Sequence, residues 1–128
     1  MKKIVFILCA VFTLTTLTSC MWDHENDTDY SVAENSLTVV TFLHSPTCGY
    51  SCAAKEYVTQ TYPNAAIRFI DIDLAGNRYF LKAAKQDYGL DSYINTPVIC
   101  FGPLYIEGWD YEKRQRLDDY IQPYLKTE

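Results

Sequence analysis

The hydrophobic pattern from Leu37 onward alternates between strand-like runs and helical faces. Short runs of apolar, β-branched and aromatic residues predict four strands, at 37–43, 66–73, 97–101 and 104–107. The last two runs are separated only by Gly102 and Pro103, which indicate a tight antiparallel hairpin.

Three further segments repeat apolar residues with the period of a helix. The first begins at Gly49 and is ended by Pro63. The second starts near Arg78 and has Gly89 as its C-terminal cap, and the third begins near Asp110, a good N-cap. The expected inward faces are Ala53, Ala54, Tyr57, Val58, Thr61 and Tyr62 in the first, Phe80, Ala83, Ala84 and Tyr88 in the second, and Tyr111, Leu117, Tyr120, Ile121 and Tyr124 in the third.

The resulting order, β-α-β-α-β-β-α, predicts an α/β fold in a single domain, residues 36–128. Strands that are joined through a helix are expected to be parallel, and the strands of the hairpin antiparallel. We therefore expect a four-stranded mixed sheet flanked by three helices. The segment SPTCGYSC, residues 45–52, then lies at the turn between the first strand and the first helix.

The N-terminal segment carries the pattern of an export signal. Two lysines precede an apolar run at 4–12, which is too short to cross a bilayer, so residues 1–19 predict a secretory signal peptide. The ending Leu17-Thr18-Ser19-Cys20 resembles the lipobox of bacterial lipoproteins, which implies acylation of Cys20; cleavage elsewhere would leave Cys20 an ordinary thiol. Residues 20–35 would form an acidic, lipidated tether. We expect a cell-envelope protein, periplasmic or on the cell surface, held at a membrane by this anchor.

Charge and cysteine count narrow the chemistry further. The formal charge is −5, and loss of residues 1–19 removes two lysines and no acid, which gives about −7. Nucleic-acid binding is not expected, because it needs a basic surface. The folded part keeps Cys48, Cys52 and Cys100; outside the cytoplasm an odd count usually means one pair and one spare, and Cys48 with Cys52 is the obvious pair. Cys100 lies in an apolar run, where a small hydrophobic role is expected.

Cys48 stands at the expected start of the first helix. Unsatisfied backbone N–H groups and the helix dipole stabilise a thiolate there, so we expect a lowered pKa and a partly exposed sulfur. The spacing to Cys52 strains a bridge, since Cβ atoms at i and i+4 on a regular helix lie about 5 to 6 Å apart and a disulfide requires about 3.5 to 4.5 Å. Closure therefore requires Cys48 at the N-cap or earlier, or a helix that begins with a wide turn, which Gly49 would permit.

The element order, the two-cysteine motif at the first strand-to-helix turn and Thr96-Pro97 at the third strand resemble the thioredoxin fold. Within that superfamily, SPTCGYSC and TPVICFGPLYIEGWD are most similar to glutaredoxins. The resemblance implies a thiol-disulfide oxidoreductase in which Cys48 is the nucleophile, Cys52 resolves the mixed disulfide, and a cis Pro97 holds an extended substrate beside them. It implies no cofactor, a monomer, and protein thiols or disulfides or glutathione as partners.

Several other residues take roles from this resemblance. Thr96, Pro97, Gly108 and Asp110 match part of a glutathione site, and Tyr50, between the cysteines, could shape substrate access. Ser45 stands where many glutaredoxins carry a basic residue. The chain also has three residues between its cysteines where the family has two, and it has Phe42 where thioredoxins carry the acid of a buried proton relay.

Two other interpretations remain open. Sulfurs at i and i+4 could bind a soft ion such as Cu(I); copper chaperones that resemble the Sco proteins use Cys-x3-Cys with a distant histidine. Here the only histidine within the domain is His44, four residues before Cys48, so no metal site is expected. His44 would serve equally as a hydrogen-bonded end residue or as a base or ligand. The third interpretation is an interaction module whose cysteines form a structural bridge.

Overall fold

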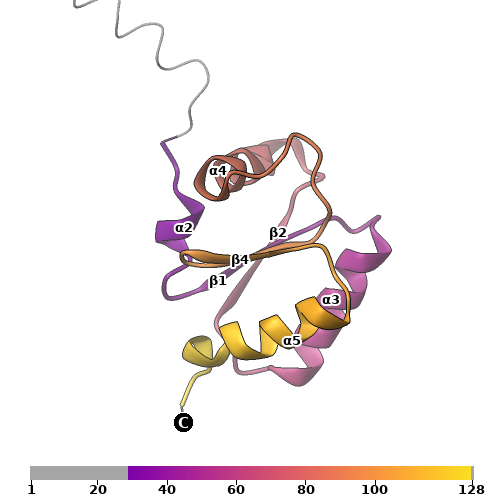
Figure 1. The fold of residues 1–128 in the computed structure, drawn as a ribbon, viewed down its shortest axis with the longest axis vertical. Helices are drawn as coiled ribbons and strands as arrows, with labels where there is room; N and C mark the ends of the chain where they lie inside the picture. Colours follow the sequence, from indigo (N-terminus) through magenta and orange to yellow (C-terminus); the bar gives the residue numbers. More distant parts are fainter. Residues whose placement is uncertain (1–28, 128) are drawn as a thin grey trace, which may run out of the picture.

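The computed structural model describes residues 29–127 (Figure 1). The expected signal peptide at 1–19, the lipidation site Cys20 and most of the expected tether lie outside these residues. Within the described part, no helix has the length and apolar character that a membrane span requires.

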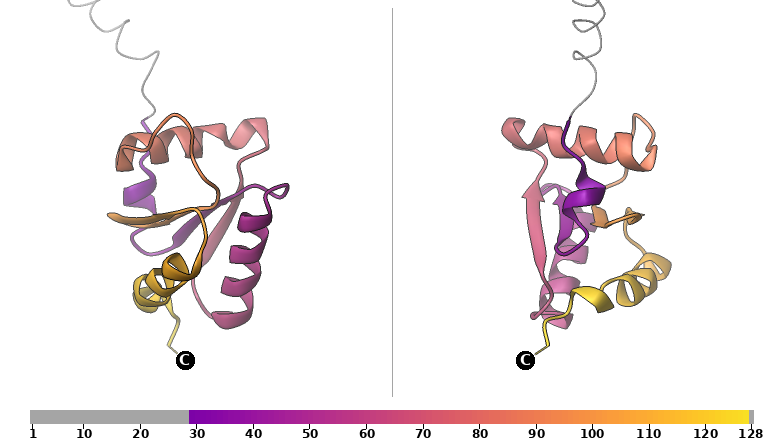
Figure 2. Two further views of the ribbon diagram at one scale, coloured as in Figure 1. Left: turned by 45° about the vertical axis from the view of Figure 1, so that its right-hand side comes forward. Right: turned by 90° about the vertical axis from the view of Figure 1, so that its left-hand side faces the viewer.

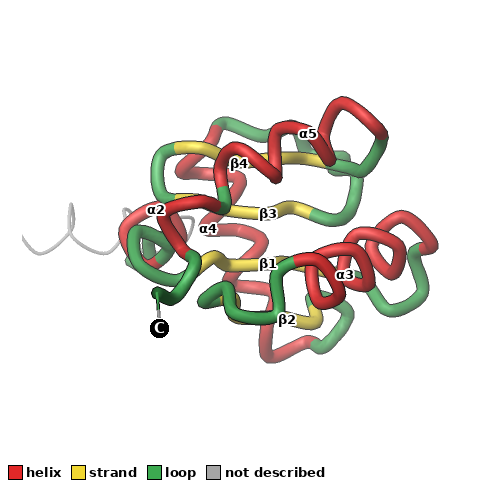
Figure 3. Tube along the Cα trace, turned by 90° about the horizontal axis from the view of Figure 1, so that it is seen from below, coloured by secondary structure: helices red, strands yellow, loops and turns green. Residues whose placement is uncertain are grey.

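A four-stranded mixed sheet forms the centre of the domain, as expected (Figure 3). Its strands lie in the order β2-β1-β3-β4. β1 runs parallel to β2 and antiparallel to β3, which pairs antiparallel with β4. The strand bounds are Val40–His44 for β1, Ile67–Asp71 for β2, Val98–Phe101 for β3 and Leu104–Glu107 for β4.

Strands joined through a helix were expected to be parallel, and this holds for β1 and β2 only. β3 also follows a helix, but it runs antiparallel to β1, with Val98 opposite Leu43, and therefore antiparallel to β2 as well. The segment 89–97 carries the chain back across the domain after the helix ends (Figure 2). β3 therefore begins at the edge where β1 and β2 end, because His44 lies opposite Asp71 in the parallel pair. Turns from three strands meet at this edge.

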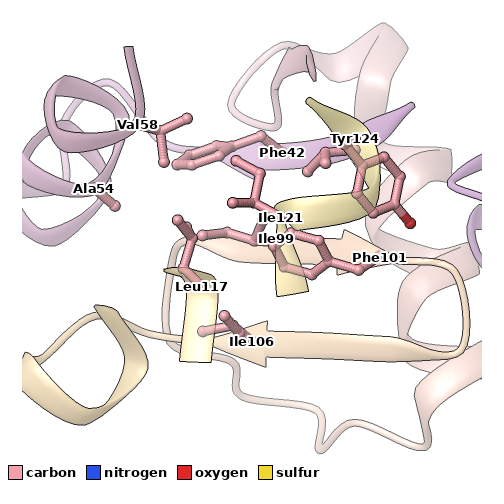
Figure 4. Close-up of a cluster of buried hydrophobic side chains, with 10 residues drawn as sticks. Phe42, Ala54, Val58, Ile99, Phe101, Ile106, Leu117, Ile121 and Tyr124 are labelled. Atoms are coloured by element: carbon pink, nitrogen blue, oxygen red, sulfur yellow. The ribbon is translucent and has the colours of Figure 1, made fainter. Parts of the chain in front are cut away.

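Helices cover both faces of the sheet (Figure 1). α3 (Gly49–Thr61) and α5 (Tyr111–Tyr120) lie on one face, and α4 (Arg78–Tyr88) with the short α2 (Val32–Asn35) lies on the other. β1 is buried on both sides, which is typical of a central strand with a continuous apolar run. The larger core cluster fills the α3 and α5 side and comprises Val40, Phe42, Ala54, Val58, Ile99, Phe101, Ile106, Leu117, Ile121 and Tyr124 (Figure 4).

The two caps predicted from sequence are confirmed. Gly89 ends α4 with φ at +65°, a left-handed conformation that glycine adopts without strain. Asp110 caps α5, because its Oδ1 accepts the Lys113 N–H at 2.9 Å. α5 ends at Tyr120, ahead of a short 3-10 turn at Gln122–Tyr124.

The domain begins earlier than expected. Residues 20–35 were predicted to form a tether, but α2 packs beside α4, with the Val32 side chain fully buried. The Ala33 N–H donates to Asp87 Oδ2 at 3.0 Å, which joins the two helices. The tether boundary was wrong because a single buried valine among polar residues produces no periodic signal.

The first strand and two helix faces also differ from prediction. Leu37 is exposed, and β1 starts three residues later, at Val40, because the chain first turns out of α2. α3 contacts the sheet along a narrow stripe of small residues, which leaves its flanks in solvent. The residues wrongly expected inside are Ala53, Thr61 and Tyr111.

Candidate functional site

Cys48 lies at the N-cap of α3, one of the two arrangements expected to allow a bridge. Its backbone is extended, with φ −96° and ψ 121°, and the turn is held by the Cys48 N–H donating to Ser45 O at 3.1 Å. The chain enters this turn directly from buried β1, so the thiol stands at the edge of the sheet where the strand turns meet. The side chain is partly exposed.

The surroundings of Cys48 favour its thiolate. Hydrogen bonding by the Thr96 side chain is the largest effect that lowers the pKa of Cys48, followed by the backbone N–H of Ser51. Partial burial opposes these contacts, and the net direction is downward. A thiolate at a helix start also faces the positive end of the helix dipole. The pKa of Cys48 is therefore shifted in the direction that the sequence predicted.

The expected cis peptide bond is confirmed at Thr96-Pro97, next to this thiol. Pro97 is fully buried, and its carbonyl accepts the Gly108 N–H at 2.7 Å. The Thr96 carbonyl oxygen lies 3.8 Å from Cys48 Sγ, a contact that the protonated thiol makes as a donor. The residue before the proline thus faces the sulfur, 48 positions away in sequence.

A cleft of about 600 Å³ opens in front of Cys48. Of the residues predicted for the site, it gathers Cys48, Tyr50, Thr96, Gly108 and Asp110. Pro97 and Cys52 are not part of its wall. Sequence reasoning missed the residues that complete the lining, which are Tyr93, Ile94, Asn95, Trp109 and Lys113.

Cys52 differs from Cys48 in where its sulfur points. It is exposed, and its Sγ donates to Pro46 O at 3.4 Å, in the turn that precedes the helix. Its N–H donates to the Cys48 carbonyl at 3.1 Å, so both residues belong to the first turn of α3. Within residues 29–127, Cys48 and Cys52 are both free thiols, and so is Cys100.

Ser51, which the sequence did not single out, takes the buried position in this turn. It is only 1% exposed, three residues after Cys48, and its Oγ accepts the Ser45 N–H at 3.2 Å. Its side chain also contributes to the lowered pKa of Cys48. A period count that started from Ala54 and Val58 and ran back one turn would have found it.

A polar cluster supports the turn from the side of β2. Ser45 Oγ donates to Asp73 Oδ2 at 2.8 Å, and Thr47 Oγ1 lies 3.1 Å from Ser45 Oγ. His44 is buried, with its ring beside Phe69 at 6.3 Å between centroids, and burial lowers its pKa. In the described part of the chain, no three side chains of the metal-binding types gather into a cluster.

Cys100 fits the role of a small hydrophobic residue. It is fully buried in β3, within the cluster on the α4 side. Burial raises the pKa of its thiol to about 12. A thiol in this environment stays protonated and out of reach of large reagents.

Comparison with known proteins identifies the fold. No protein-family model matches the sequence, and no curated protein matches it. Among solved structures, the chain is similar to the solution structure of the dithiolic glutaredoxin 2-C-Grx1 from the pathogen Trypanosoma brucei brucei, with a TM-score of 0.55 and 17% sequence identity over 78% of this chain and 100% of that one. The chain therefore has the glutaredoxin-like α/β arrangement of the thioredoxin fold.

Proposed function

We propose that this protein is a thiol-disulfide oxidoreductase in which Cys48 is the nucleophile. The observation that carries the proposal is the place of its sulfur, partly exposed in a cleft at the start of a helix and 3.8 Å from the carbonyl of the residue before a cis proline. The lowered pKa enlarges the thiolate fraction at neutral pH, and the thiolate is the attacking species.

The first step is attack of the Cys48 thiolate on one sulfur of a substrate disulfide. The substrate S–S bond breaks, a mixed disulfide forms, and the electron pair leaves on the other substrate sulfur, which takes a proton from water. In the second step a second thiolate attacks Cys48 Sγ and releases the substrate thiol. The substrate gains two electrons and two protons, and the protein is left with a disulfide; the reverse sequence oxidises a dithiol.

Cys52 is the proposed resolving cysteine. It shares the first helical turn with Cys48, and the solved structure that this chain resembles is described as a dithiolic glutaredoxin. Its side chain must rotate away from Pro46 O before the sulfurs meet, and exposure leaves it room to do so.

Titration in glutathione buffers tests this assignment. The full chain, purified in mild detergent, is equilibrated at graded redox ratios and its alkylated thiols are counted by mass. We expect one reversible two-electron transition between roughly −120 and −270 mV, absent in Cys48→Ser and in Cys52→Ser and retained in Cys100→Ala. A pair that stays reduced in every buffer contradicts the proposal, and Cu(I) binding by that reduced pair would favour a soft-metal module. A pair that never becomes reduced would be a structural bridge.

We also propose that the protein is a lipid-anchored monomer of the cell envelope, with protein thiols and disulfides or glutathione as its partners. The support is the Leu17-Thr18-Ser19-Cys20 ending after a short apolar run. Replacing Cys20 with Ala should move the protein from the membrane fraction to the soluble fraction. An unchanged distribution, with no lipid mass on the purified chain, would contradict the anchor.

A further inference from the structure

Aromatic side chains border the cleft at Cys48. Tyr50 is 67% exposed and Tyr93 is 82% exposed, and both lie in the cleft wall. Ile94 and Trp109 are partly buried and continue the lining. Covering apolar surface of this kind is favourable by about 25 cal/mol per Å². The cleft therefore offers aromatic surface that can pack against side chains next to the cysteine of a substrate.

Trp109, which lines the cleft, is held in place by packing against α3. Its ring lies 5.7 Å from the Tyr57 ring, between centroids. The Tyr57 hydroxyl donates to Asp118 Oδ1 at 2.7 Å, which ties α3 to α5. A preorganised aromatic wall loses little conformational freedom when a ligand binds against it.

The charges of the cleft do not suit an anionic ligand. Lys113 is the one cation among the lining residues that the structure describes. Its Nζ lies 3.6 Å from Oδ2 of Asp110, which lines the same cleft and whose pKa is lowered chiefly by the Lys113 backbone N–H, so the carboxylate is charged. The Asn95 N–H, a further donor, is already given to Glu107 Oε2 at 2.9 Å.

Glutathione carries two carboxylates and one ammonium group, so it needs cations or free N–H donors at its ends. The lining supplies one cation, and that cation has a carboxylate partner. The chain as a whole has a formal charge of −5, which adds repulsion at low salt. A neutral or basic polypeptide segment needs no free cation in the cleft and is not repelled by the negative charge of the chain. Its side chains can also cover the exposed rings.

Resting on the proposed function, we propose that this cleft selects cysteines of polypeptide substrates flanked by aromatic or large apolar side chains, in preference to glutathione. The flanking side chain would pack against the rings of Tyr50, Tyr93 and Trp109, which line the same cleft as Cys48. The cleft volume of about 600 Å³ suits a segment of a few residues, within the usual range of roughly 300 to 1,000 Å³ for ligand pockets.

Three mixed disulfides with one chromogenic leaving group test the selectivity. Each joins 2-nitro-5-thiobenzoate to a cysteine: in acetyl-Phe-Cys-Phe-amide, in acetyl-Ala-Cys-Ala-amide, or in glutathione. Cys48 attacks the cysteine sulfur, the S–S bond breaks, and the coloured thiolate leaves with the electron pair, because the lower-pKa thiol leaves faster. We expect the full chain in mild detergent to react with the phenylalanine probe at least tenfold faster than with the alanine probe, and slowest with glutathione.

Two variants separate the aromatic and charge contributions. Tyr93→Ala should reduce the phenylalanine-to-alanine rate ratio at least threefold, while Tyr79→Ala, a 45% exposed tyrosine of α4 outside the cleft, should leave that ratio unchanged. Asp110→Asn keeps an N-cap side chain and frees Lys113, so the glutathione-to-alanine ratio should rise two- to fivefold at low salt.

The outcomes are distinguishable. Three probes that react within twofold of one another, or glutathione reacting fastest, would overturn the selectivity while leaving Cys48 chemistry intact. Release no faster than that of Cys48→Ser with all three probes would overturn the proposed function and the selectivity together.

Discussion

Cys48 and Cys100 are the same residue type in opposite environments. Cys48 follows the end of β1, where the backbone turns into a helix and its N–H groups are available to a sulfur. Cys100 lies within β3, where burial raises the pKa of its thiol to about 12. Backbone position, rather than residue type, therefore decides which thiol can act as a nucleophile.

Alkylation rates should separate the two cysteines most strongly. In the native chain at pH 7, iodoacetamide should modify Cys48 more than about a thousandfold faster than Cys100, because Cys100 reacts only after the domain opens, at a free-energy cost of several kcal/mol. Peptide mass mapping after timed quenching measures both rates. Comparable rates in the native chain, without urea, would show that β3 is not closed around Cys100.

The buried Ser51 and the exposed Cys52, neighbours in the turn at Cys48, should differ in their contribution to the free energy of unfolding. Ser51→Ala removes the acceptor of the Ser45 N–H and leaves a buried donor unpaired, which should cost about 1 to 3 kcal/mol in the free energy of unfolding. The neighbouring exposed Cys52→Ser should change it by no more than about 0.5 kcal/mol. Urea unfolding measures both. Equal effects would mean that Ser51 does not support the turn.

Cys100 should also make stability depend on alkaline pH. Its pKa is raised to about 12 in the folded state and is about 8.5 in an unfolded chain, so above pH 8.5 only the unfolded state loses the proton and stability falls as pH rises. From pH 7 to pH 10, Cys100→Ala should lose about 1 to 2 kcal/mol less than the unmodified chain. Val98→Ala, a buried change without a titrating group, should lose as much as the unmodified chain. Parallel losses in all three would contradict the assignment.

The smallest expected effect concerns the hydroxyl beside Cys48. Thr96→Val keeps the side-chain shape and removes the hydrogen bond that contributes most to the lowered pKa of Cys48. Alkylation of Cys48 at pH 6 should slow about two- to tenfold, since less thiolate is present. Thr47→Val, at an exposed threonine directly before the cysteine, is the matched control and should have a smaller effect. A pH profile of the alkylation rate shows whether the change lies in the pKa, as expected, or in access to the sulfur.

The parts of the fold with a strong local signal could be predicted. α4 was bounded correctly because its helical period runs without interruption up to a capping glycine, and Gly89 has the expected positive φ. The start of α3 at Gly49, which makes Cys48 the N-cap, followed from the helical pattern, and the cis bond at Pro97 followed from resemblance. These features are encoded in a few neighbouring residues.

The rest of the site depends on contacts between distant segments. Tyr93 and Lys113 reach the cleft from a loop and from α5, and neither belongs to a pattern that marks a site in the sequence. Burial of Ser51 depends on the narrow contact stripe of α3 against the sheet, which only the packed structure shows. The direction of β3 likewise depends on the return path of segment 89–97.

The docking of α2 beside α4 limits how far the domain could stand from a membrane. With the proposed anchor at Cys20 and the folded part beginning near Tyr30, about ten residues remain to span the gap. Ten residues reach at most about 35 Å when fully extended, little more than the width of a domain of this size. Had residues 31–35 belonged to the tether, the reach would be longer by about 17 Å. An anchored copy would therefore meet only disulfides that come within about two domain widths of the bilayer surface, one for the tether and one for the domain itself.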